Sequence, residues 1–382
     1  MQILQFIVLL SIFLSLAFNF NIIEGSLFFS NLIALFLSVV IFLNLKIIEI
    51  NKEKRSILVL LIGCIFILIN MQSIYGLKWL YLIIIYFSYY VYFKYYHLST
   101  NLILLTYAVS LSIGAILSFN FVDPSLLGYN LLSDDFRGSI DVLGGYNTFG
   151  VLAAIGIIIF FHFAQSSKNI SIKLIYILGI ILLFYALIST LSRGGFVSFF
   201  LGFLFYNILS KSLRTFIYFL LPIVLFISIF IFSSDIDITG LINRYTFFED
   251  ATGSGRTVLW SYILSSINNP INIIFGHGAG SLGFYTSVTE GLSYSLFETS
   301  HNTYLDILYE FGMIGITVFM LFIYRIYLKL QNIEDTEEYK ILITIFLVIF
   351  LSMFFDSYMG SLQISAIFSL FFALLSSERK HA

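Results

Sequence analysis

Long runs of apolar residues, each near the length that crosses a bilayer, dominate this sequence. A helix rises about 1.5 Å per residue, so about 20 mainly apolar residues cross roughly 30 Å of hydrocarbon. Twelve segments qualify, near 3–20, 27–45, 57–73, 79–93, 101–119, 146–164, 172–190, 194–209, 215–232, 303–323, 341–355 and 361–375. The runs lack the alternation of barrel strands, so the sequence predicts an all-α integral membrane protein with about 12 transmembrane helices.

Composition narrows the possible functions. Of the 382 residues, 59% are hydrophobic and 10% are charged, whereas about 25% of the residues in soluble domains are charged. The net charge of −2 excludes a basic nucleic-acid binder. The single cysteine, Cys64, allows neither an intrachain disulfide nor a cysteine-based zinc site. No repeat or linker divides the chain, so residues 1–382 are predicted to form a single polytopic membrane domain.

The positions of Lys and Arg predict how the chain is oriented, because segments rich in these residues stay cytoplasmic. With a cytoplasmic N-terminus, the inner connections hold 14 of the 19 Lys and Arg residues, and the C-terminus is also inside. The outer side keeps the other five, which are Lys78, Arg137, Arg193, Arg244 and Arg256. This distribution predicts a multi-pass membrane protein with both termini in the cytoplasm.

Two predicted outer connections are long, and long polar insertions are often functional. They are 120–145 and 234–300, both expected on the outer side of the membrane. The second contains a predicted surface helix near 255–269, which Pro270 is expected to end. Its predicted apolar face consists of Val258, Leu259, Tyr262, Ile263 and Ile267.

Arginine is favoured over lysine among the outer cations, which points to an anionic ligand. A guanidinium stays charged and binds phosphate oxygens with two parallel hydrogen bonds. Arg193 stands beside Gly194 and Gly195 at a helix end, and Arg256 opens the predicted surface helix, whose N–H groups attract anions. Arg244 has less local support. The alternative is that each arginine pairs with an outer acid or anchors in lipid headgroups.

His301 is the candidate general base. It precedes the predicted helix at 303–323, with Thr299 or Ser300 expected to cap that helix. The positive end of a helix disfavours an imidazolium, so a neutral ring is available to accept a proton. Asp306 and Glu310 follow one turn apart and either hold His301 or the arginines in place or solvate the helix mouth.

Two further patterns give weaker signals. Residues 278–283 fit the dinucleotide motif G-x-G-x-x-G, but no strand and helix flank it, so its glycines are expected to form a tight turn or to let a sugar chain pass. Asp134, Asp135 and Asp141 lack the fixed ligand set that a divalent cation needs. No metal or other cofactor is predicted.

The run from His301 to Gly315 resembles the signature of bacterial O-antigen ligases and related surface-polysaccharide polymerases. In that family a His and a polar residue are separated by nine residues from Gly-x-x-Gly. Here His301 and Asn302 precede the nine residues 303–311, and Gly312 and Gly315 follow. The pair Arg193-Gly194, and Arg256 with Trp260 four residues on, extend the likeness over 193–315.

The resemblance implies a metal-independent glycosyltransferase of the helical class that uses lipid phosphosugars (GT-C-like). Such enzymes take a glycan from undecaprenyl pyrophosphate at the periplasmic face of the bacterial inner membrane, so the resemblance also implies this location. It implies that His301 activates the acceptor hydroxyl and that Arg193 and Arg256 bind the pyrophosphate. It also implies that Asn302 orients His301 or binds sugar, and that Gly312 and Gly315 allow close packing of a helix or lipid.

Three functions remain open at this point. A polymerase joins the donor chain to a second lipid-linked repeat, a ligase transfers it to lipid A-core, and a flippase moves the lipid-linked oligosaccharide without forming bonds. We favour the polymerase, although nothing in the residues identifies the acceptor. The flippase is less favoured because the ionisable groups gather in one outer loop and at helix ends. Expected partners are membrane lipid and, for an assembly enzyme, chain-length regulators.

Overall fold

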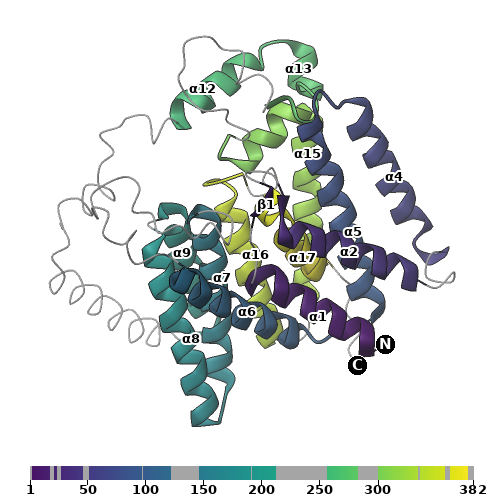
Figure 1. The fold of residues 1–382 in the computed structure, drawn as a ribbon. Helices are drawn as coiled ribbons and strands as arrows, with labels where there is room; N and C mark the ends of the chain where they lie inside the picture. Colours follow the sequence, from purple (N-terminus) through teal and green to yellow (C-terminus); the bar gives the residue numbers. More distant parts are fainter. Residues whose placement is uncertain are drawn as a thin grey trace. The chain divides into compact units, whose positions relative to one another are not determined.

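Helices form nearly all of the regular structure in the part of the chain that the computed structural model describes (Figure 1). The described residues are 2–17, 21–23, 27–45, 51–96, 98–121, 146–190, 192–211, 256–282, 300–333, 336–357 and 362–376. Within them, an antiparallel pair of β1 (Asn21–Ile23) and β2 (Leu27–Phe28) departs from the predicted all-α fold. Contacts divide the chain into two compact units.

Unit 1 comprises Met1–Thr106, Ser254–Ile333 and Met353–Ala382. Its helices are α1 (Gln2–Ala17), α2 (Phe29–Asn44), α4 (Lys54–Ile69), η1 (Ile74–Gly76), α5 (Leu77–Tyr96), α12 (Arg256–Ser266), α13 (Pro270–Phe275), α15 (Thr303–Gln331) and α17 (Leu362–Ser376), with the first turns of α6 (Thr100–Phe121). Helix α17 packs against α2, α5 and α15, and every side chain from 365 to 376 is buried. This helix therefore forms the core of unit 1.

Unit 2 comprises Tyr107–Gly253 and Glu334–Ser352. It contains the rest of α6 with α7 (Tyr146–Ser166), α8 (Ile170–Ser189), α9 (Arg193–Leu209) and α16 (Thr336–Ser352). Helix α7 is apolar on all sides, which is typical of a fully buried helix, and α8, α9 and α16 pack around it. A Cβ on Gly195 of α9 would lie 2.8 Å from the backbone of Gly150, so glycines let α7 and α9 cross closely.

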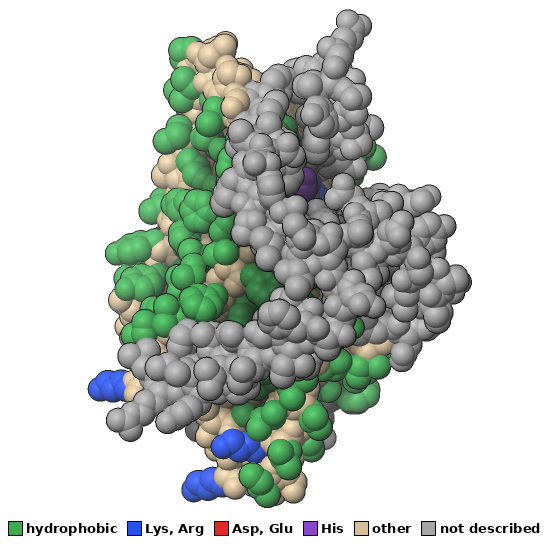
Figure 2. All heavy atoms as spheres, turned by 90° about the vertical axis from the view of Figure 1, so that its left-hand side faces the viewer, with side chains coloured by type: hydrophobic (Ala, Val, Ile, Leu, Met, Phe, Trp, Pro, Cys, Tyr) green, Lys and Arg blue, Asp and Glu red, His purple; other side chains and the backbone are tan. Residues whose placement is uncertain are grey.

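Large apolar side chains cover much of the described surface. In α8, Ile175, Leu178 and Ile181 are more than half exposed, which is unfavourable in water but suits a helix that faces lipid. Figure 2 shows a largely hydrophobic described surface on one face of the molecule, with Lys and Arg gathered at its lower end. The chain is therefore a helical membrane protein.

The predicted spans agree closely with the helices. Eleven of the twelve predicted segments coincide with a helix, and the remaining segment, 215–232, lies outside the described residues. Among the described helices, 5 are long and apolar enough to cross a membrane: Ile74–Tyr96, Thr100–Leu117, Asn147–Ser166, Ile170–Ser189 and Thr303–Gln331. The total of 12 spans and the orientation stay predictions.

The predicted surface helix is two helices. Helix α12 ends at Ser266, and Pro270 begins α13 rather than ending the helix before it. Pro at the first position costs no hydrogen bond, and the Asn269 side chain caps α13 by accepting the Ile271 N–H at 3.0 Å. The apolar face of α12 covers α15, since Leu259, Ile263 and Ile267 pack with Leu282 and Tyr309. The side chains of Val258 and Tyr262 lie outside the described residues.

Candidate active site

His301 lies in the turn that leads into α15, with a backbone conformation that few non-glycine residues adopt. Its φ is 55°, in the left-handed region. The next residue, Asn302, is the N-cap, where the sequence predicted Thr299 or Ser300. The Asn302 side-chain oxygen accepts hydrogen bonds from the N–H groups of Tyr304 and Leu305, at 3.0 and 3.2 Å. This helix cap fixes the chain immediately after His301.

Asp356, in the segment that follows α16, contacts the ring of His301 directly. Its Oδ1 lies 3.0 Å from His301 Nδ1 and accepts the Ser357 N–H at 2.9 Å. Burial would raise the pKa of Asp356, but hydrogen bonds from His301 and Ser357, with the charges of His301 and Arg256, lower it overall. An ionised carboxylate at Nδ1 favours the tautomer in which Nε2 is the proton acceptor. The His301 ring is 35% exposed, so a substrate can reach it.

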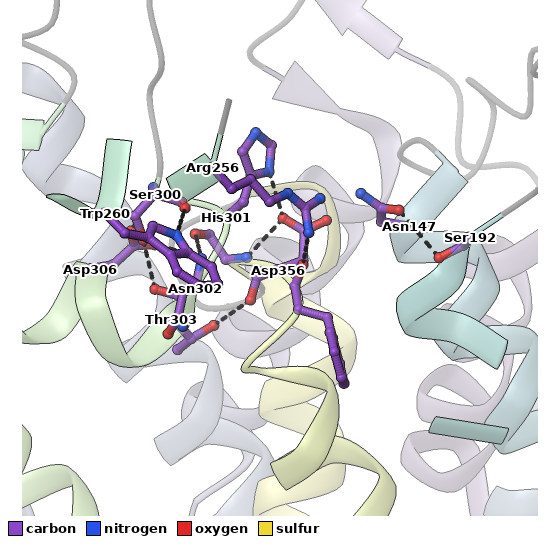
Figure 3. A network of polar contacts seen from close by, with 12 residues as sticks. Asn147, Ser192, Arg256, Trp260, Ser300, His301, Asn302, Thr303, Asp306 and Asp356 are labelled. Carbon is purple, nitrogen blue, oxygen red and sulfur yellow. Dashed lines mark hydrogen bonds and ion pairs between the residues drawn. The ribbon is translucent and has the colours of Figure 1, made fainter. Parts of the chain in front are cut away.

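Arg256 and Trp260 reach this site from α12 (Figure 3). Arg256 Nη1 donates a hydrogen bond to the carbonyl of Phe355 at 2.8 Å, directly before Asp356 in the chain. Trp260, one turn later, donates from Nε1 to the carbonyl of Ser300 at 2.9 Å. The structure thus brings two of the predicted site residues, His301 and Arg256, together around Asp356.

Asp306 holds the backbone that precedes His301. It is completely buried, and its Oδ1 accepts the Ser300 N–H at 2.8 Å. The N–H of Asn302 donates to the hydroxyls of Ser300 and Ser357, at 3.1 and 3.0 Å. Asp306 therefore supports His301 through the neighbouring peptide and does not solvate the helix mouth. We call Arg256, Trp260, Ser300, His301, Asp306 and Asp356 the His301 cluster.

Helix α15 bends at Gly312, the first glycine of the motif. Gly312 has φ 62° and ψ −159°, so the helix hydrogen bonds are interrupted there. The carbonyls of Tyr309 and Glu310 instead accept hydrogen bonds from the N–H groups of His277 and Gly278, at 2.8 and 2.9 Å. A Cβ on Gly312 would lie 2.5 Å from the carbonyl of Ile274. Gly312 thus allows α13 to approach the bend.

Gly315 lies one turn beyond the bend and contacts the first half of α15. A Cβ at this position would lie 2.3 Å from Cβ of Phe311 and 3.3 Å from the Ile307 side chain. No larger residue fits here without moving the segment that carries His301. Gly315 therefore shapes α15 itself, whereas Gly312 also makes room for α13.

Glu310 belongs to a second polar cluster with different partners. Lys78 Nζ lies 3.3 Å from its Oε1, and the N–H of Gly280 donates to its Oε2 at 3.0 Å. The indole of Trp79 also donates to Oε2. Lys78 is 8% exposed and Glu310 is 0% exposed, so this is a buried ion pair. We call Lys78, Trp79, Gly280 and Glu310 the Glu310 cluster.

The glycine-rich turn that contributes Gly280 to this cluster is tight, as its sequence predicts. Gly278 and Gly280 have φ of 98° and 77°. A Cβ on Gly278 would lie 2.5 Å from the carbonyl of Asn70, and one on Gly280 would lie 2.3 Å from the nitrogen of Gly76. The turn therefore fits between the segment before α5 and the bend in α15.

Arg193 begins α9 in unit 2 and is exposed. The Ser192 hydroxyl caps this helix by accepting the Gly195 N–H at 3.1 Å and lies 3.2 Å from the Asn147 side-chain oxygen. The N–H groups of the first turn favour an anion at this end of α9. Arg244, Asp134, Asp135 and Asp141 lie outside the described residues.

Metal ligands do not gather in the described part of the chain. No group of three or more His, Cys, Asp and Glu residues that could hold a metal ion occurs there. The His301 cluster brings together an imidazole, a carboxylate and a guanidinium.

The fold and the site define a helical membrane protein in which an imidazole, a carboxylate and a guanidinium lie at the start of a bent helix. A family model described as O-antigen ligase matches residues 178–320, which include α9, α12, α13 and the motif at 301–315. The match confirms the resemblance to the O-antigen ligases and related polymerases. No curated protein matches the chain.

Asp356 is the site residue that the sequence analysis missed. It lies beyond the matched segment, in the short connection between the predicted spans 341–355 and 361–375. The topology carried a signal, because that connection is predicted on the same side as His301. A carboxylate in a short outer connection between two spans was a candidate partner for the histidine.

Proposed function

We propose that this protein transfers a glycan from undecaprenyl pyrophosphate to an acceptor hydroxyl at the periplasmic face of the bacterial inner membrane, with inversion at the anomeric carbon. The observation that carries the proposal is the contact of His301 with Asp356, on a segment that Arg256 also binds. The family match supports a ligase or a related polymerase. A GT-C-like architecture is part of the same proposal.

The proposed step needs a base at the acceptor and positive charge at the leaving group. The acceptor oxygen attacks the anomeric carbon, and its proton passes to Nε2 of His301. The bond from the anomeric carbon to the diphosphate oxygen breaks, and that oxygen keeps the electron pair. Arg256 stabilises the negative charge that develops there, while the carboxylate of Asp356 stabilises the imidazolium formed on His301.

Other arginines complete the proposed binding of the diphosphate. Arg193 stands at the N-terminal end of α9, where the helix dipole adds to its positive charge. Arg244 is proposed from its place in the predicted periplasmic loop. Neither residue is needed for the contact between His301 and Asp356, so their variants should alter donor binding before they alter the base.

One experiment separates the possible acceptors. Purified, reconstituted protein is incubated with undecaprenyl-pyrophosphate repeat units alone, and the products are resolved by size. A ladder of products identifies a polymerase, and a product that forms only after lipid A-core is added identifies a ligase. Movement of the lipid-linked repeat between leaflets without a new glycosidic bond would contradict the proposal and identify a flippase.

A further inference from the structure

Two side chains one turn apart on helix α12 bind the backbone next to His301 and next to Asp356, the two residues of the proposed base. Residues four positions apart lie on the same face of a helix. From this face Arg256 binds the carbonyl of Phe355, and Trp260 binds the carbonyl of Ser300, at 2.8 and 2.9 Å. The first carbonyl directly precedes Asp356 and the second directly precedes His301.

The conformation of His301 requires support of this kind. A non-glycine residue in a sparsely populated backbone region is strained and persists only where its surroundings fix it. At Ser300 both backbone groups are bound, the N–H by Asp306 Oδ1 and the carbonyl by Trp260 Nε1. Of these contacts, the Trp260 bond is the one that comes from outside the α15 segment.

The position of Trp260 is itself fixed by packing. Leu259 and Ile263 on α12 pack with Leu282 and Tyr309, and Ile263 is completely buried. Tyr309 lies on α15, two turns after the start of the helix that follows His301. The indole N–H is therefore delivered by a helix that is anchored to the same element as the histidine.

We propose that Trp260 is a positioning residue that, through the carbonyl of Ser300, sets the direction in which His301 presents its ring to the acceptor. This inference rests on the proposed function. Trp260 need not touch the substrate. Because Arg256 lies on the same helix, placing α12 on α15 orders the base and the diphosphate-binding guanidinium together.

The test replaces the indole N–H and keeps the apolar ring. Trp260→Phe removes the donor, and replacing Trp260 with 3-benzothienylalanine, which has sulfur in place of Nε1–H, removes it with almost no change of shape. The chain has two tryptophans, so Trp79→Phe is the matched control. Trp79 Nε1 donates to Glu310 and not to the His301 turn.

Both Trp260 variants should lower kcat about 5- to 50-fold and change the KM for the lipid-linked donor less than twofold, since a misplacement of about 1 Å can cost on the order of 10²-fold in rate. Trp79→Phe should lower the melting temperature and keep kcat within about twofold of wild type. In a His301→Ala background, Trp260→Phe should leave the residual rate unchanged. Wild-type kcat in both Trp260 variants, or an equal loss in the His301→Ala background, overturns the proposal.

Hydrogen exchange separates this inference from the proposed function. In Trp260→Phe the amides of residues 300–303 should exchange faster, whereas Trp79→Phe should leave them at the wild-type rate. If wild-type protein transfers no glycan to any acceptor, the proposed function fails, and faster exchange in Trp260→Phe alone still supports the positioning role. Unchanged exchange at residues 300–303 contradicts that role.

Discussion

Each of the two polar clusters on α15 pairs a basic side chain with a carboxylate, but the two pairs differ in their exposure. The His301 cluster has an imidazole that is 35% exposed and a carboxylate that is 16% exposed. In the Glu310 cluster the ammonium is 8% exposed and the carboxylate is 0% exposed. A substrate can reach the first cluster, whereas the second is buried, and its carboxylate accepts hydrogen bonds from Trp79 and Gly280.

This difference in exposure indicates which cluster supports the fold and which one is placed to react with a substrate. Glu310 is one turn from Asp306 in a motif that contains the histidine, so the sequence places it near the site. Its contacts instead join α5 and the glycine-rich turn to the bend in α15. The Glu310 cluster thus sets the shape of the helix, and the His301 cluster carries the proposed reaction.

The largest expected effect follows from His301→Ala. Loss of a positioned base lowers rates by about 10²–10⁴-fold, so glycan transfer by reconstituted protein should fall by that factor. Circular dichroism and the melting temperature should stay close to wild type, because the substitution removes a ring that is 35% exposed and keeps the hydrogen bonds that hold the backbone of Ser300 and the cap of α15. Transfer at the wild-type rate from pH 6 to 8 would show that His301 is not the base.

Asp356→Asn should lower kcat on the order of 10²-fold, since the ring of His301 loses the charge that orients it. The variant should also change how the stability of the folded protein depends on pH under acidic conditions. The pKa of Asp356 is lowered in the folded protein, so its stabilisation is present above the ordinary aspartate pKa of about 3.9 and is lost as pH falls through the lower folded value. As the pH is lowered, the melting temperature of Asp356→Asn should therefore fall less steeply than that of wild type. Equal slopes for the two proteins would contradict the contact between Asp356 and His301.

Glu310→Gln should act on stability. Breaking a buried ion pair from one side costs about 3–5 kcal/mol, because the remaining charge has no partner. Thermal unfolding should show this loss, and the double variant Lys78→Met with Glu310→Gln should recover most of it. A single variant with wild-type stability but no glycan transfer would move Glu310 into the reaction site and break the distinction between the clusters.

Gly312→Ala should lower the stability of α15 by about 1–3 kcal/mol, since its φ of 62° suits glycine and a Cβ would meet the carbonyl of Ile274. Gly63→Ala is the matched control. A Cβ on Gly63 meets no atom within 4 Å, so alanine within α4 should be neutral or slightly stabilising. Equal melting temperatures for Gly312→Ala and Gly63→Ala would contradict the structural role proposed for the bend at Gly312.

The sequence predicted helix positions well because apolar runs of this length leave few alternatives in a membrane. It also placed His301 and Arg256 in one site, since a family motif and a helix start mark them. It missed Asp356, which comes from a connection 55 residues after His301. It predicted that Asn302 orients His301 or binds sugar, and the structure adds that its side chain caps α15. The bend at Gly312 was not predicted, because it depends on the contact with α13 and not on a local pattern.

The central claim is that Arg256 and His301 act on one substrate. The most direct test measures donor binding and glycan transfer separately in variants of each residue. Binding of a donor analogue with a non-cleavable diphosphonate should weaken in Arg256→Lys, because an ammonium cannot form the paired hydrogen bonds of a guanidinium. His301→Ala should bind the analogue like wild type and fail to transfer glycan. The control variant Arg325→Lys, on an exposed face of α15, should bind the analogue and transfer glycan like wild type. Wild-type binding and turnover in Arg256→Lys would contradict the claim.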